Sequence, residues 1–190
     1  NHIQEEVHLN SFTDDELRWI KNNPEIKFHL DDNSPPFQYE SQSGSIQGIT
    51  PDLLLVLENH TGIKFTPVVH SQKEYVNRGN MKEASIFGMW PRFASASIPD
   101  YTPTLTIASG YLSLFGNPDL QITSYKDLID SRIVCVAATN NRLPKLFSSQ
   151  NTIIDVESTE EAISYLLSDK ADYMLEFSEV AKYHLKKNQV

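Results

Sequence analysis

Short strand-like segments alternate with helix-like segments along almost the whole chain of 190 residues. The strand-like segments are residues 26–30, 64–69, 85–90, 110–115, 133–137, 152–156 and 172–175. A parallel strand pair needs a crossover connection, usually a helix, so single helices between short strands indicate βαβ units. The pattern predicts an α/β fold with two small, mostly parallel sheets flanked by helices.

Capping boxes mark where several helices begin. Thr13 and Glu16 have the spacing at which each side chain satisfies an amide at the start of a helix. This pair predicts a helix over residues 14–22. The same spacing recurs at residues 71–74 and 158–161, and it predicts two more helix starts there.

Another helix is predicted over residues 51–60, with Thr50 as its N-cap. Pro51 costs no hydrogen bond in a first turn, and Gly62 suits the C-terminal end. A turn signal at residues 117–119 then predicts a boundary between two lobes near the middle of the chain.

Charge and composition exclude several classes of protein. The chain has 16 Lys and Arg against 25 Asp and Glu, a net charge of −9, and 39% of its residues are hydrophobic. Nucleic acids and anionic membranes need clustered Lys and Arg, and this apolar content argues against disorder. We therefore expect an acidic globular unit with no nucleic-acid partner.

Few residues suit metal binding or catalysis. Cys135 is the single cysteine and lies in a strand-like segment, so we expect a buried, inert thiol. The histidines lack metal-ligand spacing, and His29 is expected in the core or at the edge of the first sheet. No Gly-rich phosphate loop or nucleophile elbow occurs. The sequence predicts no metal, no cofactor and no enzyme activity in this chain.

The order of motifs resembles a known family. Residues 12–26 read FTDDELRWIKNNPEI and resemble the segment that precedes Venus-flytrap sensor domains of bacterial histidine kinases. The motifs that follow resemble those of family 3 periplasmic solute-binding proteins. They are DDNSPPFQY at 31–39, GITPDLL at 48–54, TGIKF at 61–65, PDYT at 99–102, SYKDL at 124–128, RIVCV at 132–136, STEEA at 158–162 and KADY at 170–173.

This resemblance implies a bilobed, type II periplasmic-binding-protein-like fold that does not catalyse. Residues 1–11 would be an N-terminal leader, residues 12–108 lobe 1 and residues 109–190 lobe 2, with a hinge near Ser109. In the family the chain returns to lobe 1 and ends there. Because this chain is shorter, that C-terminal return is expected to be missing, either because the fragment is cut short or because the first lobe lacks its last helices.

The resemblance also implies that a standard amino-acid site is absent. The family's carboxylate-binding arginine falls at Ser95, and its ammonium-binding aspartate falls at Phe177. Its stacking aromatic falls at Ser34, and its small hydroxyl residue falls at Trp90. These replacements change charge or size, so free amino acids are not the expected ligands.

A different ligand site is predicted at the same cleft. Its candidate residues are Asp31, Asp32, Phe37, Met89, Trp90, Arg92, Thr139, Asn140, Asn141, Glu176 and Phe177. Aromatic faces with carboxylates suit a cationic or aromatic ligand, and the helix start at residues 139–141 suits an anionic group. Ordinary packing of Trp90 and Phe177, and plain helix capping at 139–141, remain alternatives.

The family resemblance implies a periplasmic ligand-sensing domain of a bacterial membrane-bound signalling protein. The output module would be a histidine kinase or a cyclic-dinucleotide enzyme. The expected partner is a small molecule in the interlobe cleft or a periplasmic protein, and a dimer is possible. The alternatives are a solute-binding receptor of an ABC transporter and a regulatory module of a lytic transglycosylase.

Overall fold

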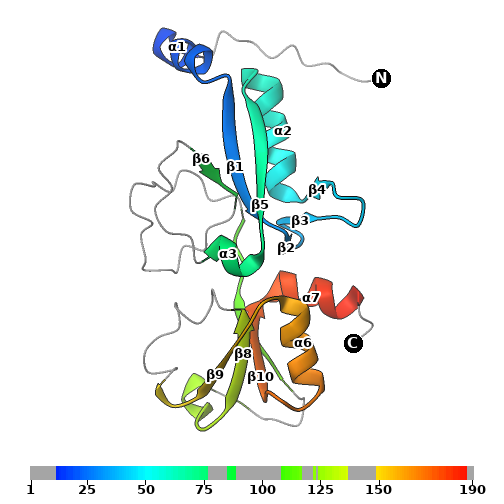
Figure 1. Cartoon of the computed structure of the whole chain (residues 1–190). Coiled ribbons are helices and arrows are strands. Elements are labelled where there is room, and N and C mark those ends of the chain that lie inside the picture. The colour runs from blue at the N-terminus through cyan, green and yellow to red at the C-terminus, as the bar shows by residue number, and fades with distance from the viewer. Residues whose placement is uncertain are drawn as a thin grey trace, which may run out of the picture.

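The computed structural model describes residues 12–76, 85–88, 108–116, 122, 124–136 and 149–187, and every statement below refers to those residues. They form two lobes, one above the other in Figure 1. The upper lobe contains α1 to β6, and the lower lobe contains β7 to α7. The predicted α/β class is confirmed.

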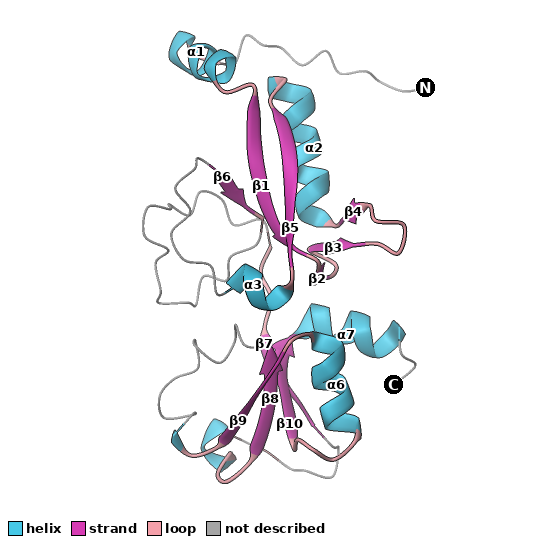
Figure 2. Ribbon diagram, in the orientation of Figure 1, coloured by secondary structure: helices cyan, strands magenta, loops and turns pink. Residues whose placement is uncertain are grey.

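The upper sheet is parallel, as predicted. Its central strand β1 (Glu25–Asp31) lies between β5 (Lys64–His70) and β6 (Ser85–Phe87). The register of β1 and β5 runs from Glu25 opposite Lys64 to Asp31 opposite His70. Helix α2 (Ile49–Thr61) covers one face of this sheet, where Leu54 packs with residues of β1 (Figure 2). The short helix α3 (Gln72–Val76) follows β5.

Helix α2 begins earlier than the sequence predicted. Its N-cap is Gly48, with φ 124°, and Thr50 lies inside the helix. A Cβ atom at Gly48 would lie only 2.5 Å from the carbonyl oxygen of Phe37, so glycine is required there. The buried Thr50 hydroxyl instead donates to the carbonyl of Gly88, 3.3 Å away. The prediction of Thr50 as N-cap was therefore wrong.

A third, small antiparallel sheet was not predicted. It consists of β2 (Asn33–Ser34), β3 (Gln38–Glu40) and β4 (Ile46–Gln47), with β3 in the centre. Its strands are too short to show a hydrophobic period in the sequence.

The lower sheet has the strand order β7-β10-β8-β9. The strands β8 (Arg132–Val136), β9 (Thr152–Val156) and β10 (Tyr173–Phe177) are parallel, and β7 (Leu112–Gly116) is antiparallel to β10. Helices α6 (Thr159–Leu167) and α7 (Ser178–Lys187) pack against one face. A 3-10 turn, η2 (Tyr125–Asp127), precedes β8.

The capping predictions largely hold. Helix α1 (Asp14–Asn22) has the predicted limits, and Thr13 and Glu16 form both reciprocal bonds. The box at residues 71–74 also forms both bonds. At α6, Ser158 accepts from the Glu161 amide, but Glu161 accepts from the amide of Glu157 and not from that of Ser158. Within the described ranges, no helix is both long and apolar enough to cross a membrane.

Candidate functional site

The carboxyl ends of strands from both sheets face the region between the lobes. Strand β1 runs down towards the lower lobe and ends at Asp31, whereas β10 runs up towards the upper lobe and ends at Phe177 (Figure 1). In open α/β sheets, ligands bind outside the carboxyl ends of the strands. The polar contacts between these ends form the candidate site, which we call the interlobe junction.

Asp31 lies at the upper side of the interlobe junction and is 2% exposed. Gln38 Nε2 donates to Asp31 Oδ2 at 2.7 Å, and the Asn33 amide donates to Asp31 Oδ1 at 3.1 Å. Burial raises the pKa of the neighbouring Asp32, and the charge of Asp31 raises it further. Two adjacent carboxyl groups thus lie at the end of β1, and Asp31 is held by hydrogen bonds.

Gln72 joins the two lobes directly. Its Oε1 atom accepts from the amide of Thr159 at 3.1 Å, and its Nε2 atom donates to Thr159 Oγ1 at 3.3 Å. Nε2 also donates to the carbonyl of Asn33 at 2.9 Å. Gln72 and Thr159 are both buried, so these bonds are shielded from water. A buried amide that lost them would pay the full cost of desolvation.

Glu176 continues this chain of hydrogen bonds into the lower lobe. Thr159 Oγ1 donates to Glu176 Oε2 at 2.9 Å, and the Phe177 amide donates to Glu176 Oε1 at 2.6 Å. Burial raises the pKa of Glu176 and outweighs these bonds, and the charge of Asp31 raises the pKa further. The structure therefore brings Asp31 and Glu176, from different lobes, within electrostatic range of each other.

Glu160 makes a second interlobe contact. Asn33 Nδ2 donates to Glu160 Oε2, and His184 Nδ1 lies 3.1 Å from Glu160 Oε1. Burial opposes ionisation of Glu160, but the contacts with His184, the backbone and Asn33 prevail and lower its pKa to about 2. At the rim, Lys73 pairs with Glu157 across the lobes. Glu160 is thus held as a carboxylate, whereas burial favours a protonated Glu176.

The predicted site residues fall into two groups. Asp31, Asp32, Phe37, Glu176 and Phe177 are described: Asp31, Phe37 and Glu176 are buried, and Asp32 and Phe177 are half-buried. The others lie outside the described residues. They are Met89, Trp90, Arg92, Thr139, Asn140 and Asn141.

Two positions bear on the predicted loss of an amino-acid site. Ser34, at the position of the family's stacking aromatic, is buried, and its Oγ lies 3.5 Å from Gln72 Nε2. Phe177, at the position of the family's ammonium-binding aspartate, carries no charge and ends β10. Ser95 lies outside the described residues.

The sequence prediction missed Gln72, Thr159 and Glu160. Their signal was the capping boxes, because Gln72 directly follows the N-cap Ser71 and Thr159 directly follows Ser158. Two helix starts that follow β5 and β9 therefore meet between the lobes. Nothing in the sequence indicated that they would meet.

The described residues offer no group of three or more metal-ligating side chains. Cys135 is buried, as expected, and burial raises the pKa of its thiol to about 12, with further contributions from Asp155 and Glu176. Its thiolate is thus strongly disfavoured at neutral pH. The arrangement joins the two lobes by hydrogen bonds between buried side chains.

No protein-family model matches the chain. A stretch of 59 residues, 31% of the chain, is 34% identical to the sensor protein EvgS of Escherichia coli O157:H7. That stretch spans only 5% of EvgS, so the chain matches a small part of this relative.

Solved structures resemble the whole chain more broadly. The B. pertussis BvgS periplasmic domain has a TM-score of 0.72 at 18% identity, covering 92% of this chain and 34% of that one. The ancestral amino acid-binding protein AncCDT-1, a precursor of cyclohexadienyl dehydratase, has a TM-score of 0.68 at 22% identity. The match covers 91% of this chain and 78% of that one. The cysteine-binding protein from Campylobacter jejuni has a TM-score of 0.65 at 18% identity, and the match covers 92% of this chain and 72% of that one. The chain has the bilobed fold of the periplasmic solute-binding proteins, as predicted.

Proposed function

We propose that this chain is the periplasmic ligand-sensing domain of a membrane-bound signalling protein of the sensor histidine kinase kind. The fold and the stretch similar to EvgS support this proposal, and the likeness to the BvgS periplasmic domain agrees with it. The domain itself would not catalyse. Its lobes would be residues 12–108 and 109–190, hinged near Ser109.

The observation that carries the proposal is the chain of hydrogen bonds from Gln72 through Thr159 to Glu176. A ligand can shift an equilibrium between lobe arrangements only by binding one of them better. Contacts that form in only one arrangement of the lobes define two states, one with these contacts and one without them. In this mechanism, the interlobe junction stabilises the closed state, and a ligand shifts the population between states.

The ligand of this site would be a small molecule other than a standard amino acid, or a periplasmic protein. An amino-acid site needs a fixed negative charge for the ammonium group and a fixed positive charge for the carboxylate. Phe177 supplies no charge, and both carboxyl oxygens of Glu176 already accept hydrogen bonds. We therefore expect L-amino acids at millimolar concentration to leave the melting temperature unchanged, and a clear rise with any of them would contradict this specificity.

The proposal is tested in the full-length parent protein in membrane vesicles. Gln72→Leu removes the bonds to Thr159 and should change the rate of autophosphorylation from ATP by about fivefold or more. The matched control is Gln42→Leu, in the exposed loop between β3 and β4. Circular dichroism verifies that both variants fold.

Equal rates for wild type, Gln72→Leu and Gln42→Leu would contradict the sensor mechanism. A parent gene that encodes only a secreted or lipid-anchored receptor would instead support the ABC-transporter alternative. A catalytic domain for peptidoglycan cleavage would support the transglycosylase alternative.

A further inference from the structure

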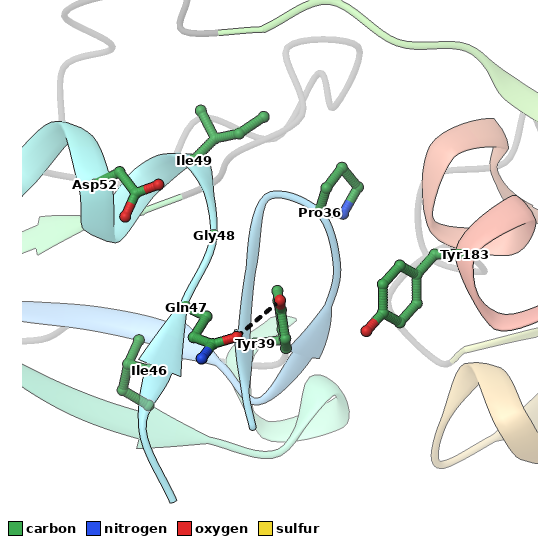
Figure 3. Close-up of a pocket in the computed structure, with 8 residues that line it drawn as sticks. All are labelled: Pro36, Tyr39, Ile46, Gln47, Gly48, Ile49, Asp52 and Tyr183. Atoms are coloured by element: carbon green, nitrogen blue, oxygen red, sulfur yellow. Dashed lines mark hydrogen bonds between the residues drawn. The ribbon is translucent and has the colours of Figure 1, made fainter. Parts of the chain in front are cut away.

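A pocket of about 460 Å³ lies next to the interlobe junction, and the two share no residue. Seven of its lining residues come from the upper lobe, between Pro36 and the first turn of α2, and Tyr183 comes from α7 of the lower lobe. Figure 3 places Asp52 on one side of the pocket and Tyr183 on the other, with Pro36 and Tyr39 between them. An occupant that fills the pocket would thus touch both lobes.

The tyrosines give the pocket aromatic walls. The ring centroids of Tyr39 and Tyr183 are 5.9 Å apart, and the rings are tilted by 46°. Tyr39 is held in place because its hydroxyl donates to Gln47 Oε1 at 3.0 Å. The ring of Pro36 and the side chains of Ile46 and Ile49 add apolar surface. These walls suit an apolar or cationic body more than an anion, because aromatic faces carry negative potential.

Asp52 makes the pocket negative. It lies in the first turn of α2, and it is the only charged residue among the described residues that line the pocket. In the part of the chain that the structure describes, no Lys or Arg lines the pocket to neutralise this carboxylate. A carboxylate and aromatic rings that line the same pocket can together bind an organic cation, since the rings and the carboxylate attract the same charge.

We propose that this pocket binds a small organic cation, an ammonium or guanidinium group on a short apolar body. The cation would lie near Asp52, and its apolar body would contact the rings of Tyr39 and Tyr183. Because Tyr183 belongs to α7 and Asp52 to α2, the bound cation would link the lobes at a second place. This site is independent of the function proposed above, and either can fail without the other.

The probe is benzylammonium, titrated into the purified chain by isothermal titration calorimetry. Benzyl alcohol and benzoate, its neutral and anionic counterparts, should bind about fivefold or more weakly than the cation. Asp52→Asn should weaken benzylammonium binding by about fivefold, and Tyr183→Leu by about threefold or more.

Asp14→Asn is the matched control, because Asp14 also lies exposed in the first turn of a helix but far from the pocket in sequence. It should leave benzylammonium affinity unchanged. Equal affinity for the alcohol and the cation would overturn the proposal. Equal weakening by Asp14→Asn and Asp52→Asn would also overturn it, since diffuse attraction to an acidic chain would then explain the binding. So would the absence of saturable binding.

Discussion

The two lobes bury different kinds of side chain. The lower sheet has apolar clusters on both faces: Val134 and Met174 pack towards α6 and α7, and Ile133, Cys135 and Leu175 pack on the opposite face. In the described part of the upper lobe, the apolar cluster contains only Phe28, Leu30 and Leu54, with Ile46 and Phe65 at its edge.

Alternation along β1 explains the difference. Phe28 and Leu30 face α2, whereas His29 and Asp31, the residues between and after them, are buried among polar partners. His29 Nδ1 lies 2.9 Å from His70 Nε2, and Asp31 is bound by Gln38. A sheet covered on both faces reads as a continuous apolar run, as in β8. The upper lobe therefore uses one face of β1 for packing and the other for polar contacts near the lower lobe.

The largest expected effect tests the packed lobe. Met174→Ala removes a fully buried side chain from a cluster with many neighbours and should lower the free energy of unfolding by about 3 kcal/mol. Leu30→Ala, also fully buried, should cost about 2 kcal/mol, because the partly exposed Ile46 and Phe65 can relax into the space. Urea denaturation measures both. A larger loss for Leu30→Ala would reverse the comparison.

Cys135 reports on the lower lobe alone. Its buried, protonated thiol should react with a thiol reagent only when the lower lobe opens. Met174→Ala lowers the free energy of unfolding of the lower lobe and should therefore raise the labelling rate by about tenfold or more. Leu30→Ala should raise the labelling rate less. Equal acceleration by both variants would mean that the lobes unfold as one unit.

The next effect tests the contact between the lobes. Gln72→Leu leaves the buried Thr159 amide without its partner and should cost about 2 kcal/mol. In a double-mutant cycle with Thr159→Val, the coupling energy should be about 1 kcal/mol. Additive costs would mean that Gln72 and Thr159 contribute separately and that the junction does not couple the lobes.

A smaller effect separates the two glutamates of the junction. The folded pKa of Glu160 is about 2, below its ordinary 4.5, so its contribution to stability is full above pH 4.5 and is lost as the pH falls towards 2. Because Glu160 is partly exposed, we expect that contribution to be only roughly 1 kcal/mol. Glu160→Gln should remove this acid-side loss in urea melts at successive pH values.

Glu176 should show the opposite dependence. Its folded pKa is raised, so its contribution favours folding below its ordinary value and is lost as the pH rises through the folded pKa. Glu176→Gln should flatten the stability profile above pH 4.5 and leave the acid limb unchanged. If both variants altered the same limb, the opposite directions of the two pKa shifts would be wrong.

The sequence predicted the framework of the fold well. All seven strand-like segments overlap a strand of the structure, because apolar runs bounded by turns and caps are local signals. The start of α2 was predicted too late because the prediction placed the N-cap at Thr50, next to Pro51, and not at Gly48. The positive φ of Gly48 depends on the close approach of the Phe37 backbone, which the sequence does not show. The sheet of β2, β3 and β4 gave no signal because its strands are too short to show one.

The candidate site was less predictable. Asp31 could be found because it ends β1 in a recognised motif, and Glu176 because it precedes Phe177, the position of the family's ammonium-binding aspartate. Gln72 and Thr159 could not, since their partnership joins residues far apart in the chain and depends on how the lobes meet. A helix start is signalled by neighbouring residues in the sequence, whereas the surface against which it packs is not.

The smallest effect concerns α1, which belongs to the upper lobe in sequence but buries no side chain. Its capping box is therefore the main source of its order, and Thr13→Ala should weaken the helix by about 1 kcal/mol. Because Trp19 and Leu17 are exposed, this loss should stay local: amide exchange should rise within residues 14–22, and the urea midpoint of the whole chain should stay unchanged. Glu25→Ala, just beyond the helix in β1, is the control that should leave exchange in α1 unaffected. A shift of the global midpoint with Thr13→Ala would mean that α1 packs against the rest of the protein in solution, and the upper lobe would then have more packing than its described cluster contains.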